Sequence, residues 1–143
     1  MAFFIAILVG IAGGVASAIQ APFTGIMGQK LSEPASVFFT YGLGGVVILL
    51  FILLTRTSLS GWQELPWYVF LAGPLGLVII FSLSFTVPRL GAVTGTSLFI
   101  ISWLVGSAII DQFGWFGVDV RSLGLERILG IAALILGTYL VAR

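Results

Sequence analysis

One uncharged stretch constrains this chain more than any other feature. It comprises the 21 residues from Leu90 to Ile110, which lie between Arg89 and Asp111 and carry no ionisable side chain. A helix rises about 1.5 Å per residue, so a stretch of this length covers about 30 Å, the thickness of a bilayer's hydrocarbon core. A soluble core helix would rarely run so long without a polar face. The stretch therefore predicts a membrane-spanning helix with a charge at each end.

The same stretch is rich in small and weakly polar side chains. They are Gly91, Thr94, Gly95, Thr96, Ser97, Ser102, Gly106 and Ser107. In lipid, such residues let neighbouring helices approach closely and form hydrogen bonds with one another. We therefore expect this helix to lie at the packed centre of a bundle, where it would form one wall of a pathway if the bundle carries a solute.

Composition extends this interpretation to the whole chain of 143 residues. Hydrophobic residues make up 59% and charged residues 8%, whereas soluble domains carry about 25% charged residues. The chain has no Cys and no His, so it lacks the commonest metal ligands, and we expect neither a metal nor a cofactor. No basic cluster suggests a nucleic-acid partner, and the lack of strand-length alternation excludes a β-barrel.

The apolar runs predict an all-α, integral membrane bundle of five transmembrane helices in one domain, residues 1–143. The expected helices are at about 2–27, 34–55, 66–87, 90–110 and 123–142. The first run lacks the basic region of a secretory signal, so we interpret it as a retained helix. The last is short for a span, and its charge-free part needs Arg127 to extend toward the headgroups. Ser32 or Glu33 is expected to cap the second helix, close to Pro34.

Two pairs of glycines predict close helix packing. Gly10 and Gly14 are four residues apart, and Gly130 and Gly137 are seven apart. Each spacing places both glycines on one helix face, where a second helix can approach. We expect these faces to pack against other helices or to form a dimer contact.

Polar residues within the apolar runs are the candidates for a solute site. Gln20 and Thr24 share a helix face, and an unpaired amide at that depth would cost several kcal/mol. Gln20 either bonds to a neighbouring helix or lines a cavity, and Tyr41 either packs or faces a pathway. The full candidate set for solute binding is Gln20, Thr24, Tyr41, Ser97, Ser102 and Trp103.

Two charged residues flank the central stretch. Arg89 either reaches into the lipid headgroups or contacts an anionic solute at a cavity mouth. Asp111 is either a capped or water-exposed acid or a residue that couples transport to an ion.

The basic residues give no preferred orientation in the membrane. Arg56, Arg121 and Arg127 fall on one expected face, and Lys30, Arg89 and Arg143 fall on the other. Because the positive-inside rule has no bias to act on, we expect copies to insert both ways. Two opposite copies would then pair as an antiparallel, dual-topology homodimer, which resembles the inverted repeats found within many transporters.

Several motifs along nearly the whole chain resemble the YdcZ family of the drug/metabolite transporter superfamily. They are Gln20 in a Gly-rich helix, Pro34, Pro66-Trp67 with Gly73 and Gly76, Pro88-Arg89-Leu90-Gly91, Asp111 with Phe113-Gly114, and Arg127-x-x-Gly130. The resemblance implies five helices, the bacterial inner membrane and antiparallel homodimers of single members.

The chain departs from the family pattern at three places. Thr24 replaces a common Asn, Ser102-Trp103 replaces Gly-Gln, and Gln112 replaces a common His. The polar pocket typical of the family would therefore be altered, with an indole in its wall. The resemblance implies a class of protein and not a particular ligand.

Two functions fit these observations. The first is a transporter of a small, mainly neutral or apolar solute, working by alternating access across the homodimer. The second is a non-transporting component, meaning a scaffold, a partner subunit or a lipid-binding bundle. An enzyme is not expected, because the chain has no His, no Cys and no pair of acids at mid-depth.

Overall fold

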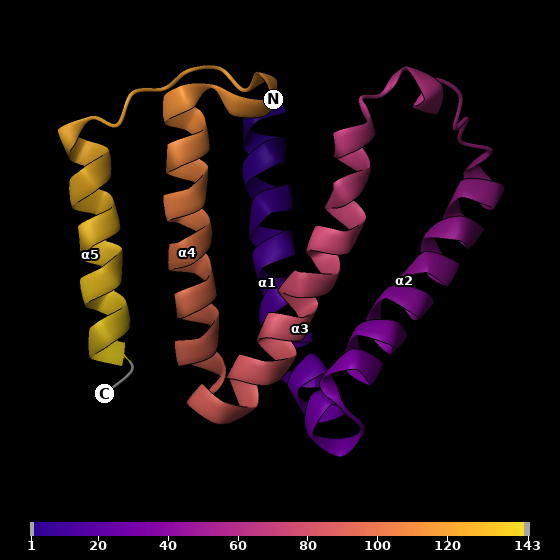
Figure 1. Ribbon diagram of the computed structural model, residues 1–143, viewed down its shortest axis with the longest axis horizontal. Helices are drawn as coiled ribbons and strands as arrows, with labels where there is room; N and C mark the ends of the chain where they lie inside the picture. Colours follow the sequence, from indigo (N-terminus) through magenta and orange to yellow (C-terminus); the bar gives the residue numbers. More distant parts are fainter. Residues whose placement is uncertain (1, 142–143) are drawn as a thin grey trace. The chain divides into compact units, whose positions relative to one another are not determined.

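The computed structural model describes residues 2–141, and within them the chain is helical without any strand (Figure 1). The α-helices are α1 (Ala2–Lys30), α2 (Glu33–Thr55), α3 (Ala72–Leu90), α4 (Ala92–Phe113) and α5 (Leu125–Val141). Short 3-10 helices are η1 (Trp62–Glu64), η2 (Trp67–Leu71) and η3 (Trp115–Gly117). The prediction of an all-α chain is confirmed, whereas Ala142 and Arg143 lie outside the described residues.

Four helical segments are long and apolar enough to cross a membrane. They are Phe3–Lys30, Glu33–Thr55, Trp67–Leu90 and Ala92–Phe113. The described part of α5 has 17 residues, which is close to the lower limit for a span. Four spans therefore follow from length and composition, and the fifth stays a prediction.

The chain divides into two compact units. The first contains α1, α2 and most of α3 and ends at Pro88, and the second begins at Arg89 and contains α4 and α5. The expectation of a single five-helix domain stays a prediction.

Local sequence explains where helix α2 begins. The Ser32 side chain accepts a hydrogen bond from the Ala35 N–H at 3.3 Å, which confirms that this serine caps the helix. Pro34 follows within the first turn, where a missing N–H costs nothing. The α1–α2 connection is therefore shorter than expected, because α1 continues to Lys30.

Prolines and glycines also shape the later helices. Residues 67–71 form the 3-10 helix η2 where we expected the start of an α-helix. Pro74 has no N–H to donate to the carbonyl of Phe70, so the regular ladder cannot extend back through this turn. Gly114 ends α4 with a φ of 62°, and a Cβ there would lie 2.7 Å from Val120 Cγ2. Glycine is therefore needed at that position.

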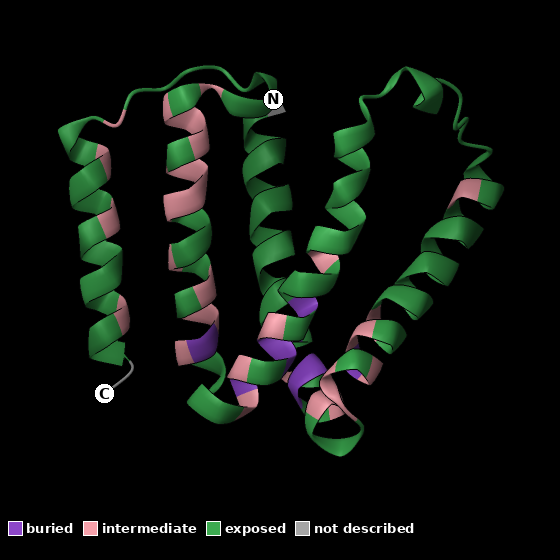
Figure 2. Cartoon of the chain, viewed as in Figure 1, coloured by how far each residue is buried: buried purple, intermediate pink, exposed green. Residues whose placement is uncertain are grey.

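The buried residues of the first unit gather where α1, α2 and α3 cross (Figure 2). They include Ala21, Thr24, Ser36, Ile80, Leu83, Ser84 and Val87. Elsewhere large apolar side chains are exposed, as with Leu54 at 83%. Such surfaces suit contact with lipid acyl chains or with another apolar helix, and they are unlike the surface of a soluble protein.

Candidate functional site

The first unit contains an open-sided hollow of about 450 Å³. All three of its helices contribute to the lining, which consists of Gln20, Thr40, Tyr41, Gly44, Gly45, Ile48 and Ile80. The glycines of α2 leave room at the wall, and the isoleucines supply apolar surface. The structure therefore brings together two of the predicted site residues, Gln20 and Tyr41.

Two polar groups of this hollow are available to a bound molecule. The Thr40 hydroxyl oxygen is buried and has no hydrogen-bond partner. Gln20 is exposed on α1, and its amide makes no hydrogen bond to any residue between 2 and 141. Polar groups inside an apolar region are costly when unpaired. A molecule in the hollow that offers a donor and an acceptor would satisfy both.

Tyr41 is held against helix α3 at a glycine. A Cβ built on Gly76 would collide with the Tyr41 hydroxyl oxygen and would lie 3.1 Å from Tyr41 Cζ. The phenol therefore occupies the space that a side chain at position 76 would need. Because Tyr41 is still 40% exposed, part of its ring is free to contact a bound molecule.

Thr24 lies in the packed crossing beneath these groups. Its side chain is buried and donates to the Ala21 carbonyl at 2.9 Å. Its own carbonyl accepts hydrogen bonds from the hydroxyls of Ser36 at 2.9 Å and Ser84 at 3.1 Å. Thr24 thus joins the three helices, and it is not among the residues that line the hollow.

The remaining predicted site residues belong to the second unit. Ser97 is half-buried on α4, and the Ser102 hydroxyl donates to the Leu98 carbonyl of its own helix at 2.9 Å. Trp103 is 66% exposed, and its ring centroid lies 5.8 Å from that of Phe99. That these residues share a cavity with Gln20 stays a prediction.

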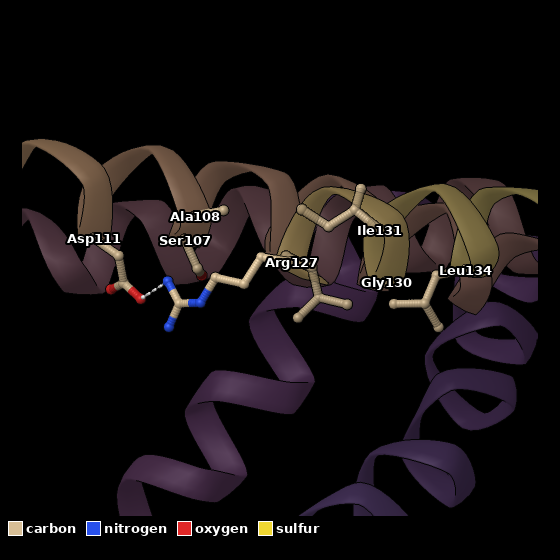
Figure 3. Close-up of a pocket in the computed structure, with 8 residues that line it drawn as sticks. Ser107, Ala108, Asp111, Arg127, Gly130, Ile131 and Leu134 are labelled. Atoms are coloured by element: carbon tan, nitrogen blue, oxygen red, sulfur yellow. Dashed lines mark hydrogen bonds and ion pairs between the residues drawn. The ribbon is translucent and has the colours of Figure 1, made fainter. Parts of the chain in front are cut away.

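A second hollow, of about 310 Å³, lies between α4 and α5 (Figure 3). Asp111 and Arg127 form an ion pair there, with 3.3 Å between the carboxylate Oδ2 and the guanidinium Nη1. The Asp111 carbonyl also accepts from the Arg121 N–H at 2.9 Å, and the Gln112 side chain accepts from the Leu123 N–H. The end of α4 therefore holds in place both the segment that joins it to α5 and the first turn of α5.

The other charged candidate, Arg89, lies exposed in the last turn of α3. The four predicted packing glycines all have open space beside them. A Cβ at Gly10, Gly14, Gly130 or Gly137 would meet nothing within 4 Å. Gly130 lines the hollow between α4 and α5, so the predicted packing face of α5 borders this hollow at Gly130.

Among the polar residues of these hollows, sequence reasoning missed the position of Thr40 and the pairing of Arg127 with Asp111. Thr40 is four residues before Gly44 on α2, a spacing that places both on one face. The opposite charges of Asp111 and Arg127 stand near the ends of consecutive antiparallel helices, which is a signal for pairing. Both signals were present in the sequence.

These observations define a multi-pass helical membrane protein with an uncharged, mainly apolar hollow that contains a few polar side chains. Residues 5–140 match the sequence model of the family described as "Putative inner membrane exporter, YdcZ". The chain belongs to this YdcZ family, a family of membrane transporters, and it is a multi-pass inner membrane protein.

One curated relative is the inner membrane protein YdcZ of Escherichia coli (strain K12). It is 28% identical over 137 residues, which cover 93% of this chain and 91% of the relative. No solved structure matches the chain. The resemblance to the YdcZ family is therefore confirmed over nearly the whole length.

Proposed function

We propose that this chain exports a small, mainly neutral or apolar solute by alternating access across an antiparallel homodimer. The observation that carries the proposal is the hollow of the first unit, where the buried Thr40 hydroxyl has no partner and the exposed Gln20 side chain lines the wall. The description of the family as an inner membrane exporter supports the direction of transport.

The lining of the hollow supports an uncharged solute. None of its described residues carries a formal charge, so a charged solute would lose its hydration without a counter-ion. The Gln20 amide offers donors and an acceptor, the Thr40 hydroxyl offers one of each, and Tyr41 offers a ring face. These groups suit a compact aromatic or apolar molecule with one or two polar atoms. Thr24, Ser97, Ser102 and Trp103 remain part of the proposed pathway.

The open glycine faces support the dimer. Nothing lies within 4 Å of a Cβ at Gly10 or Gly14 on α1. A second copy can approach such faces closely, and close approach is what drives helix association in lipid. The equal split of basic residues supports opposite insertion of the two copies.

The first hollow has no charged residue in its described lining that could couple transport to an ion. An intramembrane carboxylate that exchanges a proton for solute is the usual device, and the described lining of the first hollow has none. Asp111 would have to supply it, and its carboxylate already pairs with Arg127. We therefore propose passive or weakly coupled transport, with Arg89 and Asp111 as the charged groups to examine.

Transport by purified protein in liposomes tests the proposal. The probes are a panel of neutral fluorescent aromatic compounds, with ethidium as a cationic comparison. We expect flux of neutral probes, reduced about tenfold by Gln20→Leu and by Thr40→Val, since each variant removes a hydrogen bond in an apolar site. Thr55→Val is the matched control, because the Thr55 hydroxyl donates within its own helix to Phe51 at 2.8 Å.

The alternative is a scaffold, partner subunit or lipid-binding bundle. Folded protein that carries no member of the panel would favour that alternative. Flux that survives both Gln20→Leu and Thr40→Val would reject the hollow as the solute site.

A further inference from the structure

The hollow between α4 and α5 has a charged end and an apolar wall. Asp111 and Arg127 form the charged end, and Ser107 lies next to them. The wall continues along Leu104, Ala108, Gly130, Ile131 and Leu134. From Asp111 to Leu104 is about two helical turns, or about 10 Å. The hollow is thus a groove that runs from the end of both helices toward their middle.

The ion pair leaves part of each charged group unused. Arg127 contacts Asp111 and the Arg121 carbonyl through the same nitrogen, Nη1. Within residues 2–141, Nη2 and Nε of Arg127 and Oδ1 of Asp111 make no hydrogen bond. Both side chains are partly exposed, at 38% and 28%. A ligand can therefore add contacts to both groups without breaking the pair.

We propose that this groove binds one molecule of phosphatidylethanolamine. The phosphate would contact the free guanidinium edge of Arg127, and the ammonium would contact the free oxygen of Asp111. One acyl chain would lie along the wall from Ala108 and Ile131 to Leu104 and Leu134. This inference is independent of the proposed transport function and of the hollow beside Gln20.

Charge complementarity selects this headgroup among common phospholipids. Adjacent opposite charges match a zwitterion, and arginine binds phosphate through several N–H donors. A net anionic headgroup would face the Asp111 carboxylate without a cation of its own. A trimethylammonium headgroup carries a positive charge but has no N–H to donate to Asp111. The apolar wall suits an acyl chain, whose burial beside small residues needs no polar partner.

Native mass spectrometry of the purified protein with equal amounts of three lipids tests the proposal. The lipids are phosphatidylethanolamine, phosphatidylcholine and phosphatidylglycerol with identical acyl chains. We expect the ethanolamine lipid to be retained about tenfold more than the other two, because one charge-assisted hydrogen bond is worth about that factor. Arg127→Gln should lower its retention about tenfold, whereas the exposed Arg56→Gln should not change it.

Two further variants separate the headgroup from the wall. Asp111→Asn should remove the preference for ethanolamine over choline while the phosphate contact with Arg127 remains. Gly130→Leu should weaken all three lipids alike, because the new side chain fills the groove and leaves the ion pair intact. Gly42→Leu on α2 is its control, since a Cβ there also meets nothing within 4 Å. The Asp111→Asn comparison is a ratio of lipids within one folded sample, so a change in yield does not affect it. The Gly130→Leu comparison is the fraction of folded protein that retains lipid, measured against Gly42→Leu.

Three results would overturn the proposal. The first is equal retention of the three lipids. The second is a preference for phosphatidylglycerol that Asp111→Asn leaves unchanged. The groove would then recognise the negative charge of a headgroup and not its ammonium group. The third is efficient disulfide crosslinking of two copies through Ile131→Cys, which would mean that a second chain covers the groove.

Discussion

The Ser84 hydroxyl donates a hydrogen bond to the main-chain carbonyl oxygen of Thr24 at 3.1 Å, across 60 positions of sequence. The Ser36 hydroxyl donates to the same oxygen at 2.9 Å. One carbonyl of α1 is therefore shared by a side chain from α2 and a side chain from α3. A Cβ at Gly25 of α1 would lie 3.1 Å from Pro88 Cγ and 3.5 Å from Val87 Cγ1, so α1 and α3 are closely packed beside the shared carbonyl.

Removing these hydroxyls should destabilise the protein. Ser84→Ala and Ser36→Ala should each lower the free energy of unfolding by about 1 kcal/mol, the net worth of one buried hydrogen bond. The double variant should lose more than the sum, because only then does the shared oxygen lose both donors. Thermal unfolding followed by tryptophan fluorescence measures the effect in detergent.

Ser102→Ala is the matched control for the two serines. Its hydroxyl donates only to Leu98 in its own turn, so we expect little change. Equal destabilisation by Ser84→Ala and Ser102→Ala would contradict a special role for the shared carbonyl.

Helix α1 approaches Ser84 of α3 closely at Gly28, and this contact gives a second prediction. A Cβ there would collide with the Ser84 hydroxyl and would lie 3.2 Å from the Ser84 carbonyl. Gly28→Ala should therefore cost about 1–3 kcal/mol, as overpacking usually does. Gly42→Ala on α2 has open space and should be neutral or slightly stabilising. In the Ser84→Ala background the penalty at position 28 should shrink, and a penalty that stays the same would show that the hydroxyl is not the obstacle.

Much of the fold was predictable because a long uncharged run has few stable structures other than a membrane-spanning helix. The run from Leu90 to Ile110 predicted α4, and Ser32 was one of two candidates for the cap of α2. The spacing of apolar residues could not predict the 3-10 helix η2, because η2 depends on the missing N–H of one proline, Pro74. It also could not show that Thr40 is buried without a partner, because burial depends on how α2 meets its neighbours.

The candidate site was only partly predictable for the same reason. Gln20 and Tyr41 were identified as polar residues in apolar runs, and they do line one hollow. Thr24 was identified by the same rule, yet its side chain bonds locally to Ala21. A polar residue within an apolar run thus indicates either a hydrogen bond to the protein or a place beside a hollow. Only the packed helices show which of the two applies.

Gly76 should control the position of Tyr41 and so the shape of the hollow. In Gly76→Ala the new methyl group would take the place of the phenol's hydroxyl end, which is the movable end of a flexible side chain. We expect the free energy of unfolding to change little and the flux of neutral probes to fall several-fold. Tyr41→Phe in the same background should restore part of the flux, because the colliding oxygen is gone. Unchanged flux in Gly76→Ala would contradict a role for Tyr41 in the pathway.

The Asp111–Arg127 pair should contribute little to stability. Its side chains are 38% and 28% exposed for Arg127 and Asp111, and partly exposed pairs are typically worth about 0.2–1 kcal/mol. A double-mutant cycle with Asp111→Asn and Arg127→Gln in lipid-free detergent measures the coupling energy. We expect it to fall further at high salt, because exposed charges are screened. A coupling energy well above this range would indicate that the pair is buried in the functional assembly.

Opposite insertion of the two copies predicts a specific labelling pattern. The native chain has no Cys, so single cysteines at Gln29 and Ser60 report without background. These positions lie beyond opposite ends of α2, and Ser32 is unsuitable because it caps that helix. With three basic residues on each expected face, we expect each cysteine to react partly with an impermeant maleimide in intact cells and fully after permeabilisation. Adding two lysines between Arg56 and Ser60 should convert this mixture to one orientation, with that loop on the cytoplasmic side. Complete labelling of one native position and none of the other would show that every copy inserts the same way, and the antiparallel dimer would then have no basis.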